Sequence, residues 1–164
     1  MLRPDYYYDS VFHIPYDALK EQQIRGLIFD LDNTLTPFHE KLPPPKIVAL
    51  MNDLQKQGFE ICLVTNNTQT RLNGFNQDLQ LKGIANALKP MTRGIKKAMA
   101  LMGTTAKETV IIGDQLLSDV WSGKNAKITT IMVKPITEKD FFFVRMKRGI
   151  ERLILRNYFK EINK

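Results

Sequence analysis

The chain has 164 residues, of which 43% are hydrophobic and 25% charged, a composition that excludes a disordered protein and predicts a folded globular one. It holds no apolar run of the roughly 20 residues that cross a bilayer, and residues 1–5 lack a basic segment followed by an apolar one, so we expect neither a membrane span nor a secretory signal. The net charge of +7 is uneven: residues 139–164 carry +5 of it, so an anionic partner should be sought at this end of the chain.

Short apolar runs alternate with helical patterns along the chain. In chain order, the pattern predicts a strand at 24–30, a helix at 45–57, a strand at 59–65, a helix at 71–81, a short strand at 84–88, a helix at 92–102, a strand at 109–112, a short helix at 116–124, a strand at 128–133 and a basic amphipathic helix at about 138–160. This alternation predicts a parallel sheet covered by helices on both faces, which is the α/β class. We expect residues 1–164 to form one domain.

The only cysteine, Cys62, falls inside the predicted strand at 59–65. A lone cysteine cannot form an internal disulfide, which fits a reducing compartment such as the cytoplasm. Its apolar neighbours predict that the thiol is a small core residue.

Polar side chains follow four of the predicted strands at the point where each strand ends. The four segments are Asp30-Leu31-Asp32-Asn33-Thr34, Thr65-Asn66-Asn67, Lys89-Pro90 and Gly113-Asp114-Gln115. The carboxyl ends of parallel strands meet at one edge of a sheet, and ligands of such sheets bind there. One polar strand end is an ordinary turn, but four at the same edge would surround a pocket, so the sequence predicts an active site at this edge.

The acidic residues of these segments have the chemistry of a metal site. Asp30 and Asp32 lie two residues apart in extended chain, so their carboxylates face the same way and repel each other unless a cation or a shared proton intervenes. Asp114, with Asp119 five residues further on, adds acid at the same edge. A cluster of oxygen ligands is what Mg²⁺ binds, commonly beside a phosphate.

The same set of residues suits phosphoryl transfer, which needs mostly positioning and charge neutralisation. Asp30 has the chemistry to attack phosphorus and become an aspartyl phosphate, and Asp32 to protonate the leaving oxygen and then activate water. Lys89, the Thr65 hydroxyl and backbone N–H groups near Asn66 would hold the phosphoryl oxygens.

Each motif taken singly is also compatible with a plain structural role, such as a polar turn at 65–67 or a solvated lysine at 89. Phosphate-accepting receiver domains combine the same residue types on a parallel sheet, so they are a second interpretation. Receivers place the acidic pair first, the phosphorylated Asp on a middle strand, and then Thr and Lys. Here the order is Asp-x-Asp, Thr, Lys and Gly-Asp, which differs from that of a receiver.

This order resembles the four motifs of the haloacid dehalogenase (HAD) superfamily. The matching segments are Phe29-Asp30-Leu31-Asp32-Asn33-Thr34-Leu35-Thr36 for the first motif, Thr65 for the second, Lys89-Pro90 for the third and Gly113-Asp114-Gln115-Leu116-Leu117-Ser118-Asp119 for the fourth. The resemblance implies a Rossmann-like HAD fold in which Asp30 is the nucleophile and Asp32 the general acid and base. It also implies that Mg²⁺ is bound by the Asp30 carboxylate, the Asp32 main-chain carbonyl and Asp114, with Asp119 supporting the metal directly or through water.

Asn33 departs from the pattern, because many phosphatases of this superfamily have glycine there. Asparagine tolerates unusual backbone angles better than most residues, so we expect no loss of activity from this difference.

The flanking segments resemble a narrower group. Residues 4–10, Pro-Asp-Tyr-Tyr-Tyr-Asp-Ser, before the first motif are similar to the bacterial YqeG-type subfamily, which is related to mitochondrial phosphatidylglycerophosphate phosphatases. The stretches from Asp30 to Thr65 and from Thr65 to Lys89 are too short for the cap domain that many superfamily members fold over small substrates. The resemblance therefore implies a capless, open site and a phosphomonoester substrate, with phosphatidylglycerophosphate the leading candidate.

The C-terminal segment supplies a second reason to consider an anionic phospholipid. On a helical projection, apolar and basic residues fall on opposite sides, with Lys147 the exception. The apolar side holds Phe142, Phe143, Met146, Ile150, Leu153, Ile154 and Tyr158, and the basic side holds Arg145, Arg148, Arg152, Arg156 and Lys160. Such a helix could lie in an anionic membrane interface, peripheral to the inner membrane surface, or dock its apolar side on the sheet and leave its basic side in solvent.

Two other functions stay open at this point. One is a phosphatase of a small soluble metabolite or of a nucleic-acid 3′ phosphate, since a basic surface attracts polynucleotides as readily as lipids. The other is a membrane- or RNA-binding module with a vestigial site. The complete set of Asp30, Asp32, Lys89 and Asp114 argues against the second, because a binding module would not require all four.

Overall fold

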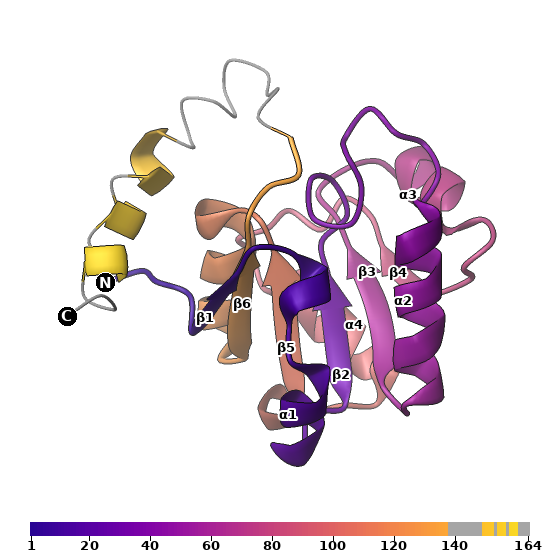
Figure 1. The fold of residues 1–164 in the computed structure, drawn as a ribbon, viewed down its shortest axis with the longest axis horizontal. Coiled ribbons are helices and arrows are strands. Elements are labelled where there is room, and N and C mark those ends of the chain that lie inside the picture. The colour runs from indigo at the N-terminus through magenta and orange to yellow at the C-terminus, as the bar shows by residue number, and fades with distance from the viewer. Residues whose placement is uncertain (138–148, 153, 157, 161–164) are drawn as a thin grey trace.

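The computed structural model describes residues 1–137, 149–152, 154–156 and 158–160 and contains a six-stranded sheet in the order β1-β6-β5-β2-β3-β4 (Figure 1). The strands are β1 (Tyr6–Tyr8), β2 (Gly26–Phe29), β3 (Glu60–Val64), β4 (Lys82–Ile84), β5 (Thr109–Gly113) and β6 (Thr129–Val133). Every neighbouring pair is parallel. The α/β class with a parallel sheet is thereby confirmed.

Helices cover both faces of this sheet. They are α1 (Tyr16–Glu21), α2 (Pro45–Lys56), α3 (Gln69–Asn76), α4 (Arg93–Met102) and α5 (Trp121–Ala126), with short 3-10 turns η1 (Val11–His13) and η2 (Ala106–Glu108) and a π-helical turn η3 (Leu116–Val120). Successive residues of a strand point to opposite faces. Phe29 therefore packs in one buried cluster with Met51 of α2, whereas Ile28 packs in another with Ile95 of α4.

Proline and glycine mark the ends of α2 and α4, the two helices that the sequence predicts most accurately. Pro45 opens α2 in the first helical position, where its missing N–H costs no hydrogen bond, and Gly58 follows the helix with φ 95°. Gly103 ends α4 in the left-handed conformation, with φ 65°. Both helices lie where the sequence places them.

The third predicted strand is displaced from its expected position. It is expected at residues 84–88, whereas β4 covers Lys82–Ile84. Asn86 and Leu88 have φ values of 48° and 55°, which a strand cannot contain. Residues 85–88 instead form a loop that folds back, with the Ala87 N–H donating to the Thr65 carbonyl at 3.0 Å.

The C-terminal segment docks on the rest of the fold where it is described. Residues 149–152, 154–156 and 158–160 are helical, and 138–148 of the predicted helix lie outside the described residues. Leu155 and Tyr158 are buried in a cluster with Met132 of β6. The Glu151 carboxylate accepts a hydrogen bond from the Leu117 N–H at 2.8 Å, which ties this segment to η3. Among the helices of the described ranges, none has the length and apolar character that a membrane span requires.

Candidate active site

The three central strands deliver polar residues to one edge of the sheet. Phe29 of β2 is in register with Leu63 of β3 and Ile112 of β5, so the residues that follow these strands emerge together. The Asp30 N–H extends the ladder by donating to the Ile112 carbonyl at 2.9 Å. The sheet thereby brings Asp30 and the segments that follow β3 and β5 to a common edge, as the sequence predicts.

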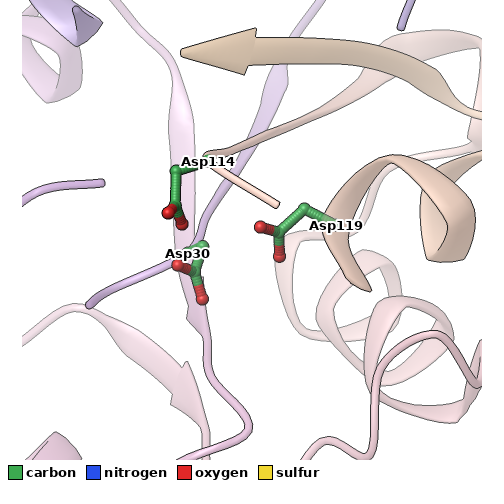
Figure 2. Close-up of side chains that lie close together, drawn as sticks. All are labelled: Asp30, Asp114 and Asp119. Atoms are coloured by element: carbon green, nitrogen blue, oxygen red, sulfur yellow. The ribbon is translucent and has the colours of Figure 1, made fainter. Parts of the chain in front are cut away.

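Three buried carboxylates meet at this edge. Asp30, Asp114 and Asp119 each offer an oxygen, and these oxygens lie within 4.8 Å of one another. Figure 2 shows their side chains turned toward a shared point, Asp30 and Asp114 from strand ends and Asp119 from the following turn. Gly113 makes this approach possible, because a Cβ at that position would lie 2.2 Å from the Asp119 Cγ.

Lys89 is buried against two of these carboxylates. Its Nζ lies 2.7 Å from Asp30 Oδ1 and 2.6 Å from Asp119 Oδ1, and it also donates to the Val64 carbonyl at 2.8 Å. Burial by itself would lower the pKa of Lys89, but the charges of Asp119 and Asp30 outweigh burial and raise that pKa above its ordinary value. Lys89 is therefore a fixed positive charge at the site, and a solvated surface lysine is excluded.

The pKa of the Asp119 carboxyl group is also raised by these surroundings, which in an acid disfavours the charged form. Burial and the neighbouring charge of Asp30 raise its pKa, and Lys89 only partly offsets them. The backbone N–H of Gln115 also donates to Asp119 Oδ2 at 3.0 Å. Asp119 thus links Lys89 to the turn that follows β5.

The donor set at this edge fits a hard divalent cation. Lys89 supplies one positive charge against three carboxyl groups. The buried cluster therefore keeps negative charge that water does not screen. On the other side of Asp30, the Thr34 hydroxyl lies 3.2 Å from both Asp30 Oδ2 and Asp114 Oδ1, and its single hydrogen serves only one of them at a time. Clustered carboxylate oxygens in this environment are the ligands that Mg²⁺ and similar ions prefer.

Asp32 lies at the same edge, but its carboxylate is bonded to Arg71 and Asn67 and does not join the other three acids. Asp32 Oδ1 lies 3.0 Å from both Nε and Nη2 of Arg71, and Oδ2 accepts a hydrogen bond from Asn67 Nδ2 at 3.0 Å. The carboxylate of Asp32 is not part of the three-carboxylate cluster. The metal contact that the motif resemblance implies for Asp32 is through its main-chain carbonyl, and that contact stays a prediction.

Thr65 and Asn66, which the sequence predicts to bind phosphate together with Lys89, directly follow β3. The Asn66 side chain accepts from the Lys89 N–H at 2.7 Å and donates to the Lys89 carbonyl at 3.0 Å, so it holds the backbone of Lys89 in place. The Thr65 hydroxyl accepts from the Asn67 N–H at 3.0 Å. Because the Asn66 amide and the Asn67 N–H both have partners, the backbone N–H of Asn66 stays the predicted contact with a phosphoryl group in this turn.

A cleft of about 320 Å³ opens over these residues. It is lined by Asp30, Asp32, Thr65, Asn66, Asn67, Lys89, Gln115 and Ser118. A second cleft, of about 360 Å³, lies at the opposite edge, beside Arg25 and Glu108, which precede β2 and β5 and pair with each other at 3.1 Å. Ligands of parallel α/β sheets bind at the carboxyl ends of the strands, so the first cleft is the candidate site.

Three residues that make contacts at the site are not predicted from the sequence: Thr34, Asn67 and Arg71. Thr34 and Asn67 belong to segments already singled out, so their proximity could have been suspected. Arg71 comes from the first turn of α3 and leaves no spacing signal, because its pairing with Asp32 arises only from the folding of the sheet. Asn33 has φ 62°, in the left-handed region that asparagine tolerates, and its side-chain oxygen accepts from the Thr137 hydroxyl at 2.6 Å.

The fold and this site define a class of hydrolase. The family model described as "Haloacid dehalogenase-like hydrolase" matches residues 36–133, and the chain belongs to this family. The protein is a phosphatase of the family, with the YqeG-type relationship that its sequence predicts.

Three of the similar proteins carry the names of phosphatases. "Probable phosphatase YqeG" of Bacillus subtilis (strain 168) is 35% identical over 93% of this chain and 88% of its own length. "Phosphatidylglycerophosphate phosphatase 1, chloroplastic" of Chlamydomonas reinhardtii is 29% identical over 87% of this chain, which spans 56% of that relative. In structure, the cobalt-bound deoxy-D-mannose-octulosonate 8-phosphate phosphatase of Haemophilus influenzae superposes with a TM-score of 0.55 over 84% of this chain and 90% of that one, at 17% identity, and shows a common fold.

Proposed function

We propose that this protein is a Mg²⁺-dependent phosphomonoester hydrolase that works through an aspartyl phosphate on Asp30 and that its substrate is phosphatidylglycerophosphate. The observation that carries the reaction type is the position of Lys89 Nζ, held between Asp30 and Asp119 in a buried cluster with Asp114. A carboxylate nucleophile, a fixed cation and metal-binding acids within a few ångströms are the components that phosphoryl transfer uses.

In the first half of the reaction, an Asp30 oxygen attacks phosphorus and the ester P–O bond breaks. Asp32 donates a proton to the departing oxygen, so the alcohol leaves neutral. In the second half, Asp32 removes a proton from water, the water oxygen bonds to phosphorus, and the acyl phosphate bond breaks to restore Asp30. Lys89, the Thr65 hydroxyl and the backbone N–H of Asn66 would stabilise the phosphoryl oxygens throughout.

Asp30, Asp114, Asp119 and the Asp32 main-chain carbonyl would hold Mg²⁺, which supplies charge neutralisation to the phosphoryl group when bound. The metal-binding role rests on the carboxylate cluster and on the shared hydrogen of Thr34. If the metal is required, chelation of divalent ions should stop turnover.

A lipid substrate is supported by what surrounds the cleft. The name of the Chlamydomonas relative gives phosphatidylglycerophosphate as that enzyme's substrate. Leu88 and Met91, which flank Lys89 and Pro90, are 65% and 63% exposed. Ile136, whose N–H donates to the Asn33 carbonyl, is also exposed at this edge. Apolar side chains beside an open phosphatase site suit an enzyme that meets its substrate at a membrane surface.

The basic C-terminal residues suit the same surface. Arg152, Arg156 and Lys160 are exposed, whereas Leu155 and Tyr158 of the same segment are buried. The docked helix thus leaves basic side chains available to anionic headgroups, so docking on the sheet and contact with a membrane are compatible. We propose a peripheral position on the cytoplasmic side of the inner membrane.

Phosphate release from a panel of substrates tests the proposal. The panel contains phosphatidylglycerophosphate in vesicles, a sugar phosphate and an oligonucleotide with a 3′ phosphate, each with Mg²⁺ and with EDTA. We expect Mg²⁺-dependent release that is fastest on the lipid. Faster turnover of the sugar phosphate or the oligonucleotide would reject the lipid assignment but retain the phosphatase mechanism, and full activity in EDTA would reject the metal.

A further inference from the structure

Both oxygens of the Asp32 carboxylate are held by neighbouring side chains, and by different ones. Arg71 Nε donates to Oδ1 at 3.0 Å, with Nη2 at the same distance, and Asn67 Nδ2 donates to Oδ2 at 3.0 Å. Arg71 comes from α3, while Asn67 belongs to the turn before that helix. The two contacts fix the carboxylate plane from two directions.

The partners of the two Asp32 oxygens also differ in their position relative to the cleft. Asn67 lines the cleft and Arg71 does not. The Arg71 side chain is only 13% exposed, and its Nη2 is buried with no well-aligned hydrogen-bond acceptor within the described residues. Because Arg71 does not line the cleft, we place it behind Asp32, and Oδ2, which is bonded to the cleft-lining Asn67, is the oxygen on the cleft side.

We propose that Arg71 is a positioning residue for the general acid and base. It anchors Asp32 through Oδ1 and so presents Oδ2 for proton transfer; this rests on the role given to Asp32 in the proposed function. In the first half of the reaction the Oδ2–H bond breaks and an O–H bond forms on the leaving alcohol. In the second half Oδ2 takes a proton from water. Arg71 itself touches neither substrate nor phosphorus.

A second contact of Arg71 offers a competing explanation. Its Nη1 donates to the Lys41 carbonyl at 3.1 Å, which ties the loop between β2 and α2 to α3. If this tie were the whole role of Arg71, removing the side chain would loosen the loop and slow the enzyme whether or not Asp32 is present. The positioning role makes the effect of Arg71 depend on Asp32, so the two explanations predict different results in a double-mutant cycle.

The test compares wild type with Arg71→Met, Arg71→Lys, Asp32→Ala and the double variant Asp32→Ala/Arg71→Met. Each is assayed with two soluble phosphomonoesters, an alkyl phosphate whose leaving group is poor and an aryl phosphate whose leaving group is good. We expect Arg71→Met to slow the alkyl phosphate by about 10- to 100-fold, the usual cost of losing a group that orients a reactive residue. The aryl phosphate needs less protonation and should suffer less. Arg71→Lys should recover part of the loss, and Arg71→Met should add little once Asp32 is alanine.

The controls separate the possible failures. Gln69→Ala removes a side chain of the same helix that bonds only Asn73 in the described structure, at 2.7 Å, and should keep wild-type rates. Thermal unfolding identifies any variant that has lost its fold, in which case Arg71→Lys carries the test. Equal slowing of both substrates, or the same fold-loss on the Asp32→Ala background, would overturn the positioning role and leave Arg71 as a loop tie. Asp30→Asn is run in parallel, and wild-type turnover by that variant would instead reject the proposed function itself.

Discussion

Gly113 allows Asp119 to approach the other acids closely, so a side chain at this position should disturb the site. A methyl group there would lie 2.2 Å from Asp119 Cγ, well inside contact distance. We expect Gly113→Ala to displace Asp119 from Lys89 and to lower turnover by at least about 10-fold, in line with other changes that misplace a supporting group. Steady-state rates measure the effect.

The matched control for that change is Gly74→Ala in α3. Apart from its chain neighbours and the backbone of its own helix, no atom lies within 4 Å of a Cβ built at Gly74, so activity should be unchanged and the helix should gain up to about 1 kcal/mol. Wild-type turnover by Gly113→Ala would show that the approach of Asp119 does not matter for activity.

In the proposed function Asp114 serves mainly as a ligand of the metal. Asp114 Oδ1 lies beside Thr34, whereas no Asp114–Lys89 ion pair is found in the described part of the chain. Asp114→Asn keeps the shape and removes a charged ligand, so the Mg²⁺ concentration that gives half-maximal activity should rise by about 10-fold or more. Asp53→Asn, on the exposed surface of α2, should leave that concentration unchanged. An unchanged Mg²⁺ midpoint in Asp114→Asn would remove Asp114 from the metal site.

At the scale of single elements, β3 supports both the core and the site. Cys62 in its centre is fully buried, and burial raises the pKa of its thiol to about 12. A thiol that is both enclosed and protonated does not react with disulfide reagents, so we expect negligible labelling of the native protein at pH 8 and one equivalent after unfolding. Rapid labelling of the folded protein would mean that β3 is not buried within the sheet.

Helices and strands differ in how clearly their sequences mark them. α2 and α4 were well predicted because proline or glycine marks their limits and apolar residues recur at the helical period. β4 is three residues long and was placed too late, while β1 and α1 are too short to show a period and were not predicted. α3 ends at Asn76, earlier than expected, where the Asn76 side chain bonds the backbone of Leu81.

The same distinction applies to the site. Asp30, Lys89, Asp114 and Asp119 could be found because each follows a strand in a motif with a recognisable order, and the parallel sheet brings strand ends together. The orientation of Asp32 toward Arg71 could not be found, because a basic residue on a helix has the same sequence pattern whether it faces solvent or a carboxylate. Contacts made through tertiary structure leave no periodic signal.

At the scale of the whole molecule, the question is how the enzyme meets an anionic surface. Changing the exposed residues Arg152, Arg156 and Lys160 together to glutamine removes three charges without touching the buried Leu155 and Tyr158. Each basic residue near an anionic leaflet is worth about 1 kcal/mol, so co-sedimentation with phosphatidylglycerol vesicles should fall steeply. Turnover of vesicle-borne substrate should fall with it, and turnover of a soluble phosphomonoester should not.

A charge-matched control distinguishes binding through the basic C-terminal surface from binding that depends only on net charge. Lys56, Lys107 and Lys127 are exposed at the opposite edge of the sheet, and their triple glutamine variant has the same net charge. Vesicle binding that drops equally in both variants would show that net charge alone is responsible. Wild-type protein that fails to sediment with vesicles at physiological salt would exclude the membrane role of the C-terminal segment.

The proposed mechanism requires that Asp30 becomes phosphorylated during turnover. Single-turnover mixing of enzyme and substrate with Mg²⁺, quenched in acid and followed by peptide mass spectrometry, measures this step. A phosphoryl group should appear on the peptide that contains Asp30 and disappear as inorganic phosphate forms, and the folded Asp30→Asn variant should show neither. Inorganic phosphate that forms without any phosphorylated Asp30, or wild-type turnover by Asp30→Asn, would contradict the account.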